Sequence, residues 1–374
     1  MQITLTSKVQ ILPDEENKRL LKETMQAYKE ACNFVSLHIF STQNTNLKEL
    51  QKKLYYEIRD KFNLRSQMAI SVLRTVRARY VTLDSNNQPW TCIAFHKPQL
   101  DLVWNRDYSL LGNVFSLNTL EGRKKLPFSR AGSSLNGRLG TARLVYHQNK
   151  FFLHIPVTYE IKDVSNHDII NVVGVDRGIR FVATTYDTKG KTVFYSGASI
   201  NNKRKHFSSI KKELKQTGTP SARRRLKKIG RREHRWMQDV NHCISKALVK
   251  SQPSGTLFVL EDLNGIRSRI GPRSLSNQYL FSSWSYFDFE EKLIYKAALR
   301  GQMVIKVDPA YTSQTCPLCG RKNRLSRIKS KHIFRCVSCR YKSNDDRVAA
   351  INLYSKGVMY LVQSGESMPF FGGA

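Results

Sequence analysis

The sequence has few acidic residues and no long apolar run. Its 374 residues contain 62 lysines and arginines against 29 aspartates and glutamates, so the formal net charge is +33. A polyanion relieves the self-repulsion of such a chain because its binding releases counterions, which makes nucleic acid the leading class of partner. No apolar run approaches the ~18 to 20 residues that span a bilayer. We therefore expect a soluble protein with no membrane partner.

Targeting features are also missing. The first ten residues, MQITLTSKVQ, have neither the charged and apolar regions of a secretory signal nor the arginine and serine bias of a transit peptide. No repeat of fixed period is present, and the tail QSGESMPFFGGA reads as loosely ordered. The chain is long enough for two or three domains with sizeable cores. We expect a reducing cytoplasm as its compartment.

Basic residues are concentrated between Lys203 and Arg235. This stretch holds fourteen lysines and arginines and two acids. It lacks the broad apolar face of a membrane-surface helix, so a groove for phosphates fits it better than an anionic membrane, although a solvated basic face stays open. The sequence TGTP breaks the stretch, with Thr219 as a helix cap and Pro220 at the first helical position. The residues of this second helix expected in the core are Leu226, Ile229, Val240, Ile244 and Leu248. The predicted nucleic-acid contacts are Arg223, Arg224, Arg225, Lys227, Lys228, Arg231 and Arg232.

The seven cysteines are of two kinds. Cys32, Cys92 and Cys243 are isolated. An isolated cysteine is most often a small buried hydrophobic residue, so we assign no function to these three. The other four form two C-x2-C pairs separated by sixteen residues, a pattern that aims four thiolates at one tetrahedral zinc ion. Disulfides or a redox pair are the alternative, which a reducing compartment disfavours. The predicted ligands of one structural zinc ion are Cys316, Cys319, Cys336 and Cys339.

The segment around these cysteines has no acid at all. Between Pro309 and Asn344 it contains nine lysines and arginines, so we expect this zinc ribbon to contact phosphate as well. His332 offers a spare zinc ligand but is more simply interpreted as a surface histidine.

The N-terminal part of the chain changes period twice. An alternating strand, ITLTSKVQI, precedes helical periodicity that continues to about residue 80, and short alternating stretches follow from about 90 to 165. The second pattern predicts a small β-barrel or sheet, with HQNK as a turn between two strands. Residues expected in the helical core are Leu20, Leu21, Met25, Tyr28, Cys32, Val35 and Ile39.

Acidic residues follow two apolar strands in the second half. Val172 to Val175 leads into Asp176, and Thr256 to Leu260 leads into Glu261. The first of these strands, FVATTYD and TVFYS are predicted to form an antiparallel meander. A third acid, Asp345 or Asp346, precedes a helical pattern and by itself is most simply a helix cap. The residues of this pattern that fit a helix packed on the sheet are Val348, Ile351, Leu353 or Tyr354, and Met359. Two strand-end acids and one helix-start acid together are what a nuclease needs to hold two Mg2+ ions ~3.5 to 4 Å apart over a phosphodiester.

In combination these motifs resemble the TnpB family of insertion-sequence-encoded RNA-guided nucleases, which are related to compact type V CRISPR effectors. GVDRGI resembles the first RuvC motif, FVLEDLNGI the second, and YTSQTCPLCG with FRCVSC the zinc ribbon of the family. A third RuvC motif of the form D-x-x-A-A-x-N selects Asp346 to Asn352. WSYFDFEEKLIYKAALRG resembles the helix that the family places before the ribbon. The resemblance extends over nearly the whole chain.

The resemblance implies the catalytic residues. The triad would be Asp176, Glu261 and Asp346, with Asp176 bridging two Mg2+ ions and each of the other two acids holding one. Asp345 lies where many relatives carry arginine. The metal ions would activate water and stabilise the leaving oxygen, which would leave a 5′-phosphate and a 3′-hydroxyl.

The resemblance also implies a multidomain α+β fold. It comprises an N-terminal wedge-like β-barrel with a helical insertion, and an RNase H-like (RuvC) α/β nuclease domain with an inserted four-cysteine zinc ribbon. The expected bounds are 1–12 and 85–168 for the barrel, 13–84 for the helical recognition insertion, 169–308 and 343–362 for the nuclease domain, 309–342 for the ribbon, and 363–374 for a flexible tail.

The implied function is RNA-guided cutting of DNA next to a short adjacent motif, by an endodeoxyribonuclease that a transposable element encodes. The partners would be a guide RNA from the transposon end and double-stranded target DNA, bound by a monomer with one RNA in a prokaryotic cytoplasm at the nucleoid. Two alternatives stay open: a nuclease-inactive RNA-guided repressor, and a zinc-ribbon nucleic-acid-binding regulator. A transposase with a nucleophilic tyrosine or serine is disfavoured, because the sequence has no histidine-containing catalytic pattern to go with such a nucleophile.

Overall fold

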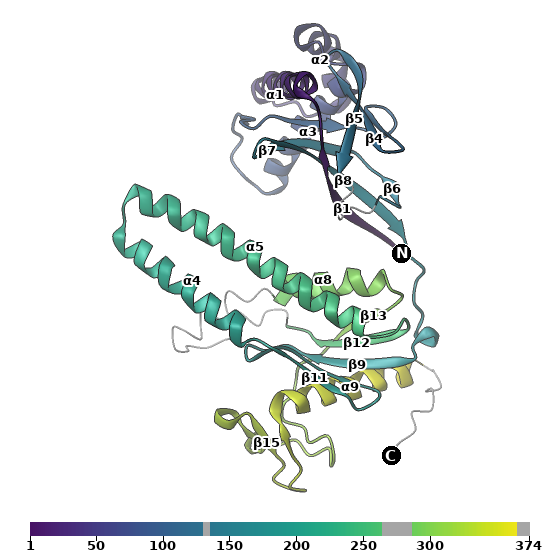
Figure 1. Cartoon of the computed structure of the whole chain (residues 1–374), viewed down its shortest axis with the longest axis vertical. Helices are drawn as coiled ribbons and strands as arrows, with labels where there is room; N and C mark the ends of the chain where they lie inside the picture. Colours follow the sequence, from purple (N-terminus) through teal and green to yellow (C-terminus); the bar gives the residue numbers. More distant parts are fainter. Residues whose placement is uncertain (130–134, 264–285, 365–374) are drawn as a thin grey trace. The chain divides into compact units, whose positions relative to one another are not determined.

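The computed structural model describes residues 1–129, 135–263 and 286–364. They belong to two compact units, Met1–Glu160 and Ile161–Ala374 (Figure 1). None of the described helices is long and apolar enough to cross a membrane. Three sequence predictions fall outside the described residues: the end of FVLEDLNGI, Trp284 of the motif before the ribbon, and the tail from residue 365.

An eight-stranded antiparallel sheet, bent into a nearly closed barrel, forms the framework of the first unit. Seven strands follow the order β2-β7-β8-β1-β5-β4-β3, with β6 paired to β8. The two edge strands, β2 and β3, are consecutive in the chain, which brings the edges of the barrel near each other. The strands are β1 (Gln2–Ile11), β2 (Gln99–Leu102), β3 (Tyr108–Leu111), β4 (Val114–Thr119), β5 (Gly122–Ser129), β6 (Arg138–Leu139), β7 (Ala142–His147) and β8 (Lys150–Glu160). The predicted HQNK turn is confirmed, because Gln148 and Asn149 take positive φ angles of 50° and 59° between β7 and β8.

Two of three helices pack against this sheet, α1 (Glu15–Thr42) and α3 (Ser66–Ser85), and α2 (Leu47–Phe62) packs on these two helices. The Asp14 and Asn46 side chains cap α1 and α2. The predicted core stripe of α1 is confirmed, since Leu20, Leu21, Met25, Tyr28, Cys32, Val35 and Ile39 are all buried. Helices and barrel share one continuous hydrophobic core.

A five-stranded sheet organises the second unit. Its order is β11-β10-β9-β12-β13; the first three strands pair antiparallel, and β12 runs parallel to both β9 and β13. The strands are β9 (Asn171–Asp176), β10 (Phe181–Asp187), β11 (Thr192–Ser196), β12 (Thr256–Glu261) and β13 (Met303–Val307). The predicted meander after Val172 is therefore confirmed.

Helices cover both faces of this sheet (Figure 1). Helix α9 (Asp345–Gln363) packs on the face that carries Val172 and Val259, while α5 (Pro220–Ser251) and α8 (Tyr286–Ala298) pack on the face that carries Val173 and Phe258. Alternating strand residues therefore serve two separate cores, as period 2 requires. Helix α4 (Ala198–Thr217) pairs with α5 in a hairpin that extends past the sheet. Thr219 caps α5 and Pro220 is its first residue, so that prediction is confirmed.

The zinc-ribbon segment lies between β13 and α9. It contains a small antiparallel sheet of β14 (Arg327–Ile328), β15 (Ile333–Arg335) and β16 (Lys342–Asn344), and β16 runs directly into α9. Short 3-10 helices occur at Asn166–Asp168, Arg324–Ser326 and Lys329–Lys331.

Some predicted core positions are wrong. Met359 is 61% exposed, because the buried face of α9 runs through Leu353, Gly357 and Leu361 instead. Cys92 and Cys243 are exposed rather than buried. Leu226 and Ile229 are partly exposed, because they lie toward the end of the hairpin that extends past the sheet.

Candidate active site

The ends of two neighbouring strands bring Asp176 and Glu261 to the same edge of the sheet. Strands β9 and β12 are parallel and Val175 pairs with Leu260, so the next residue of each strand is one of the two acids. Both acids continue the alternating series of residues whose side chains face α9. The carboxyl ends of parallel strands are where α/β sheets bind ligands.

The third acid comes from the start of α9. Asn344 is the N-cap of this helix, since its Oδ1 accepts hydrogen bonds from the N–H groups of Asp346 and Arg347 at 3.0 and 3.1 Å. The interpretation of Asp345 or Asp346 as the cap is therefore wrong. Asp346 Oδ2 is buried and has no hydrogen-bond partner. An unpaired buried carboxylate oxygen is costly, and a bound cation would remove that cost.

The three acids act on one another electrostatically. Burial raises the pKa of Asp176 well above its usual value, and the neighbouring carboxylates of Glu261 and Asp346 raise it further. Burial, followed by the adjacent Asp345, also raises the pKa of Asp346. Arg327 opposes both shifts. Mutually repelling carboxylates of this kind fit Mg2+, a hard cation that prefers oxygen ligands.

A threonine and an asparagine support Glu261. The Thr312 hydroxyl donates a short hydrogen bond to Glu261 Oε1. Asn352 Nδ2 in turn donates to the carbonyl oxygens of Thr312 and Thr315, at 2.6 and 2.9 Å. Helix α9 thus holds the loop that orients the glutamate. Sequence reasoning assigned no role to either residue, although Thr312 lies within YTSQTCPLCG and Asn352 ends the third motif.

Arg177, the residue after Asp176, ties the two strand ends together. It is 6% exposed, and it donates to the carbonyl oxygen of Glu261 at 2.5 Å and to Glu290 of α8 at 3.3 Å. This contact joins the carboxyl ends of β9 and β12. Arg177 is the arginine of the motif GVDRGI, but the sequence alone does not indicate this contact.

The four predicted zinc ligands form one cluster. The Sγ atoms of Cys316 and Cys339 lie 3.5 Å apart, and those of Cys319 and Cys336 lie 3.6 Å apart. These separations are close to the ~3.8 Å edge of a tetrahedron with zinc–sulfur bonds of ~2.3 Å, and far above the ~2.05 Å of a disulfide. Backbone N–H groups of Cys339 and Ser338 lower the pKa of Cys336 to about 6, which favours its thiolate, whereas burial raises the pKa of Cys316.

A second group of ligand-type residues lies beside Asp346. Among the residues that the structure describes, His332, Asp345 and Asp346 form the one other group of three whose ligand atoms lie within 4.8 Å of one another. The predicted triad is not such a group. A two-ion site does not require that spacing, because each carboxylate needs to reach just its own ion.

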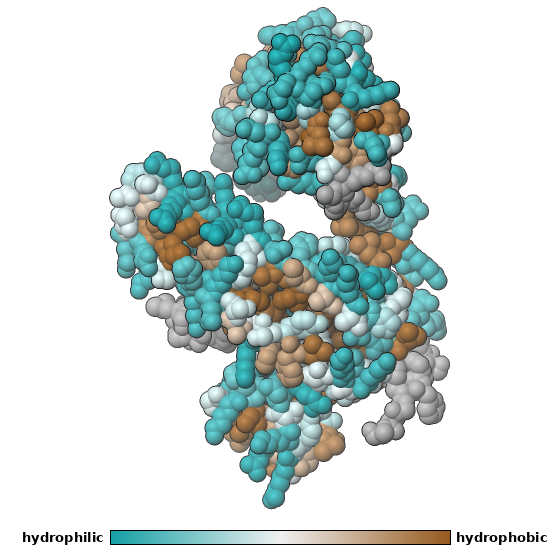
Figure 2. Space-filling view, viewed as in Figure 1, coloured by the Kyte–Doolittle hydropathy of each residue, from teal (hydrophilic) through white to brown (hydrophobic). Residues whose placement is uncertain are grey.

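The basic residues predicted to contact nucleic acid are exposed on α5. Arg223, Arg224, Arg225, Lys227, Lys228, Arg231 and Arg232 are all exposed. Hydrophilic surface covers most of the α4–α5 hairpin in Figure 2, with a small apolar area between its helices. The charge of these exposed side chains is thus available to a polyanion.

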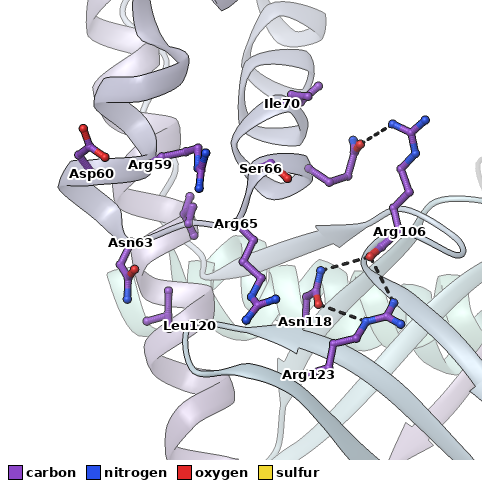
Figure 3. Close-up of a pocket in the computed structure, with 12 residues that line it drawn as sticks. Arg59, Asp60, Asn63, Arg65, Ser66, Ile70, Arg106, Asn118, Leu120 and Arg123 are labelled. Atoms are coloured by element: carbon purple, nitrogen blue, oxygen red, sulfur yellow. Dashed lines mark hydrogen bonds between the residues drawn. The ribbon is translucent and has the colours of Figure 1, made fainter.

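The first unit has an arginine-lined pocket that the sequence did not reveal. Its volume is about 1070 Å3, and it lies where the end of α2 and the start of α3 face strands β4 and β5 and the β2–β3 loop (Figure 3). The four arginines that line it are Arg59, Arg65, Arg106 and Arg123. Arg106 Nη1 donates to Gln67 at 2.9 Å, and Arg123 Nε donates to Asn118 at 3.3 Å. No run of basic residues announced this site, because its arginines come from separate elements.

Two family models match the chain. The one described as "Probable transposase" matches residues 154–264, and the one described as "Cas12f1-like, TNB domain" matches residues 286–353. Among curated proteins, the chain is 32% identical to a CRISPR-associated endodeoxyribonuclease Cas12f1 of Sulfoacidibacillus thermotolerans, over 55% of this chain and 50% of that protein. It is 28% identical to the putative RNA-guided DNA endonuclease InsQ of Escherichia coli K12, over 59% of this chain and 58% of that protein.

A TnpB-like protein of Methanocaldococcus jannaschii, MJ0751, is 30% identical over 35% of this chain and 46% of that protein. The resemblance to the TnpB family is confirmed. The chain spans about half the length of the curated relatives it matches. In fold it is similar to the mini-RNA-guided endonuclease CRISPR-Cas_phi3, with a TM-score of 0.51 and 10% identity over 98% of this chain and 93% of that one.

Proposed function

We propose that this TnpB-like chain is an RNA-guided DNA endonuclease that hydrolyses phosphodiesters with two Mg2+ ions. One observation carries the proposal: Asp176 and Glu261 end adjacent parallel strands on the face that α9 covers, and Asp346 starts α9. The relatives named as endodeoxyribonucleases or RNA-guided DNA endonucleases support it. The reaction would leave a 5′-phosphate and a 3′-hydroxyl.

In this proposal the second unit is a RuvC-like nuclease domain. A meander of three antiparallel strands followed by two parallel strands, in the order β11-β10-β9-β12-β13, supports an RNase H-like fold. The proposed domains keep the bounds expected from sequence: 1–12 and 85–168 for the wedge barrel, 13–84 for the helical insertion, 169–308 and 343–362 for the nuclease domain, and 309–342 for the ribbon.

Each residue of the site has a distinct task. Bound Mg2+ ions would supply an activated water and stabilise the charge of the leaving oxygen. Asp176, Glu261 and Asp346 would hold the ions, and Thr312 would fix the orientation of Glu261 through its hydroxyl. One zinc ion held by the four cysteines would order the ribbon, whose last strand leads into Asp346.

Guide RNA and double-stranded target DNA are the proposed partners. Exposed arginines and lysines of α5 would contact nucleic-acid backbone. The pocket between Arg59, Arg65, Arg106 and Arg123 would take phosphate groups in the N-terminal unit, where the resemblance places the reading of the target-adjacent motif. Base pairing with the guide would read the remaining target sequence.

The proposal is tested by the RNA that accompanies the protein. The gene would be expressed with about 300 nucleotides of flanking sequence, the protein washed at high salt to remove nonspecific contacts, and its retained RNA sequenced. One RNA species that maps to the flank of the gene supports guided cutting, and its free end names the DNA to test with Mg2+. Heterogeneous RNA, or none, would contradict it and favour a general nucleic-acid-binding regulator.

A further inference from the structure

Asp345 is a buried carboxylate that neither the proposed triad nor the helix cap uses. It is 1% exposed, and it immediately precedes Asp346 at the start of α9. Asn344 already caps the helix. A carboxylate this deeply buried requires a partner, because the desolvation of an unpaired charge costs several kcal/mol.

The partners of Asp345 come from the zinc ribbon. Arg327 Nε lies 2.9 Å from Asp345 Oδ2, and His332 Nδ1 lies 3.7 Å from Oδ1. The His332 carbonyl oxygen also accepts from the N–H of Asp345 and from Asn344 Nδ2, both at 3.4 Å. Both ribbon residues lie between the two cysteine pairs. The ribbon therefore contacts the start of α9 through the Arg327–Asp345 ion pair and two hydrogen bonds to the His332 carbonyl oxygen.

The ion pair is the strongest of these contacts. Arg327 is 28% exposed at its side chain, whereas Asp345 is 1% exposed, so the arginine approaches a desolvated carboxylate from the ribbon side. A hydrogen bond between two charged groups is about twice as strong as a neutral one. Removal of one partner leaves a buried charge unpaired, which disturbs the position of its neighbours.

We propose that Arg327 and Asp345 form a positioning latch that transmits the order of the zinc ribbon to Asp346. The latch rests on the proposed function, since it is the predicted metal ligand Asp346 that it positions. Arg327 and Asp345 are positioning residues and do not contact substrate. A ribbon without zinc would lose the fixed place of Arg327, and the first turn of α9 would loosen while the remaining helix stayed packed on the sheet.

A metal ion held by His332, Asp345 and Asp346 is the competing interpretation of the same cluster. Asp345 Oδ1 is buried without a hydrogen-bond partner, which a cation would satisfy, but the guanidinium of Arg327 pairs with Oδ2 at 2.9 Å and would repel a further cation. The ribbon segment from 310 to 343 adds nine positive residues and no acid. These charges favour the latch over a metal site.

The test compares Arg327→Gln, Asp345→Asn and the double variant in the full chain with its bound RNA. Arg324→Gln is the matched control, because Arg324 is an exposed arginine of the same ribbon. Three readouts apply: zinc per chain, calorimetric affinity for Mn2+, and hydrogen exchange of the amides of residues 345–350. The last two report on the latch even if no DNA is cut, so its failure is distinguishable from failure of the proposed function.

The latch predicts that each single variant keeps its zinc but binds Mn2+ about 10-fold more weakly, as outer partners of metal ligands typically do. Exchange in the first turn of α9 should be faster in each. The double variant should be no worse than either single variant, because it leaves neither charge unpaired. If Arg327→Gln has the Mn2+ affinity and the hydrogen-exchange rates of the wild type, the latch is overturned. Loss of a separate Mn2+ ion in His332→Ala, with unchanged affinity in Arg327→Gln, would replace it with the metal site.

Discussion

At the residue scale, the carboxylate of Asp176 at the end of β9 lowers the stability of the folded protein when no cation is bound. Asp176 stands beside Glu261 and Asp346, and its pKa is raised well above its usual value. Between pH ~4, the usual carboxyl value, and this raised pKa, the folded state retains a proton that the unfolded state has released. The free energy of unfolding of the metal-free protein therefore falls as pH rises through that window.

Asp176→Asn should remove this pH dependence. We expect the metal-free variant to unfold at a higher temperature than the wild type at pH 7, with little difference near pH 4. Each kcal/mol corresponds to about 2 to 4 °C for a unit of this size. Mg2+ should raise the unfolding temperature of the wild type more than that of the variant. A variant less stable than the wild type at pH 7 would show that Asp176 is held by partners other than a cation.

Thr312 provides a second test among single residues. Its hydroxyl donates to Glu261, so Thr312→Val should reduce the rate of DNA cutting about 10-fold. Thr312→Ser keeps the hydroxyl and should retain most of the rate. Thr315→Val is the control, because the Thr315 hydroxyl donates to the carbonyl oxygen of Tyr311. Equal rates for the valine and serine variants would remove Thr312 from the support of Glu261.

Sequence predicted the kinds of residue at this site better than their contacts. The apolar strands that end in Asp176 and Glu261 could be predicted from the sequence. A carboxylate at the end of such a strand is costly unless it binds a metal ion or accepts hydrogen bonds, so these two acids stood out. The choice of Asp346 over Asp345 came from the family motif. The link from Arg327 to Asp345 could not be read, since it joins residues 18 positions apart through the fold of the ribbon.

At the scale of elements, β9 and α9 approach each other closely in the second unit. A Cβ added at Gly174 would lie 2.1 Å from the carbonyl oxygen of Ala350 and 2.4 Å from the nitrogen of Tyr354. Gly174→Ala should therefore push α9 away from the sheet and cost about 1 to 3 kcal/mol or more. Gly230→Ala is the matched control in α5, where a Cβ would meet nothing within 4 Å. That variant should gain about 0.5 to 1 kcal/mol. Thermal unfolding measures both, and an unchanged Gly174→Ala would contradict the packing of α9 on β9.

The zinc-ribbon segment should lose its order as a whole when one of its four clustered cysteines is replaced. Cys336→Ser removes one of four clustered thiols, and we expect the chain to lose its zinc and the order of residues 309–342 before it loses the packing of the sheet. Elemental analysis for zinc and hydrogen exchange of the ribbon measure this. Active wild-type protein with no zinc would refute the ribbon as a metal site.

Strands and helices were largely predictable because their periods are clear. The buried stripe of α1, the turn between β7 and β8 and the cap of α5 all follow local rules. Met359 was misplaced because α9 meets the sheet along a face set by the small residues Ala350 and Gly357, which periodicity of large apolar residues does not reveal.

At the scale of the whole molecule, the net charge of +33 predicts strong dependence of binding on salt. If α5 contacts backbone, Arg223→Gln, Arg224→Gln and Arg225→Gln together should lower the slope of log affinity against log salt by about 2 to 3. Arg19→Gln, Lys52→Gln and Lys53→Gln remove the same charge from exposed residues of α1 and α2 and are the control. An equal change of slope in both triple variants would reassign the α5 arginines to a solvated face.

The sequence indicated nucleic acid at this scale, but not where the N-terminal unit would bind it. The arginines of its pocket come from α2, the N-cap of α3, the β2–β3 loop and strand β5, so no local charge run marks them. Only the fold of residues 1–160 brings them together.

The measurement that tests the account most directly is cleavage of a matched DNA by the protein with its copurified RNA, in the wild type and in Asp176→Ala. The account predicts Mg2+-dependent cutting by the wild type, with 5′-phosphate ends, and no cutting by the variant despite equal RNA content. Retained cutting by Asp176→Ala would contradict the assignment of Asp176, Glu261 and Asp346 as the metal-binding centre.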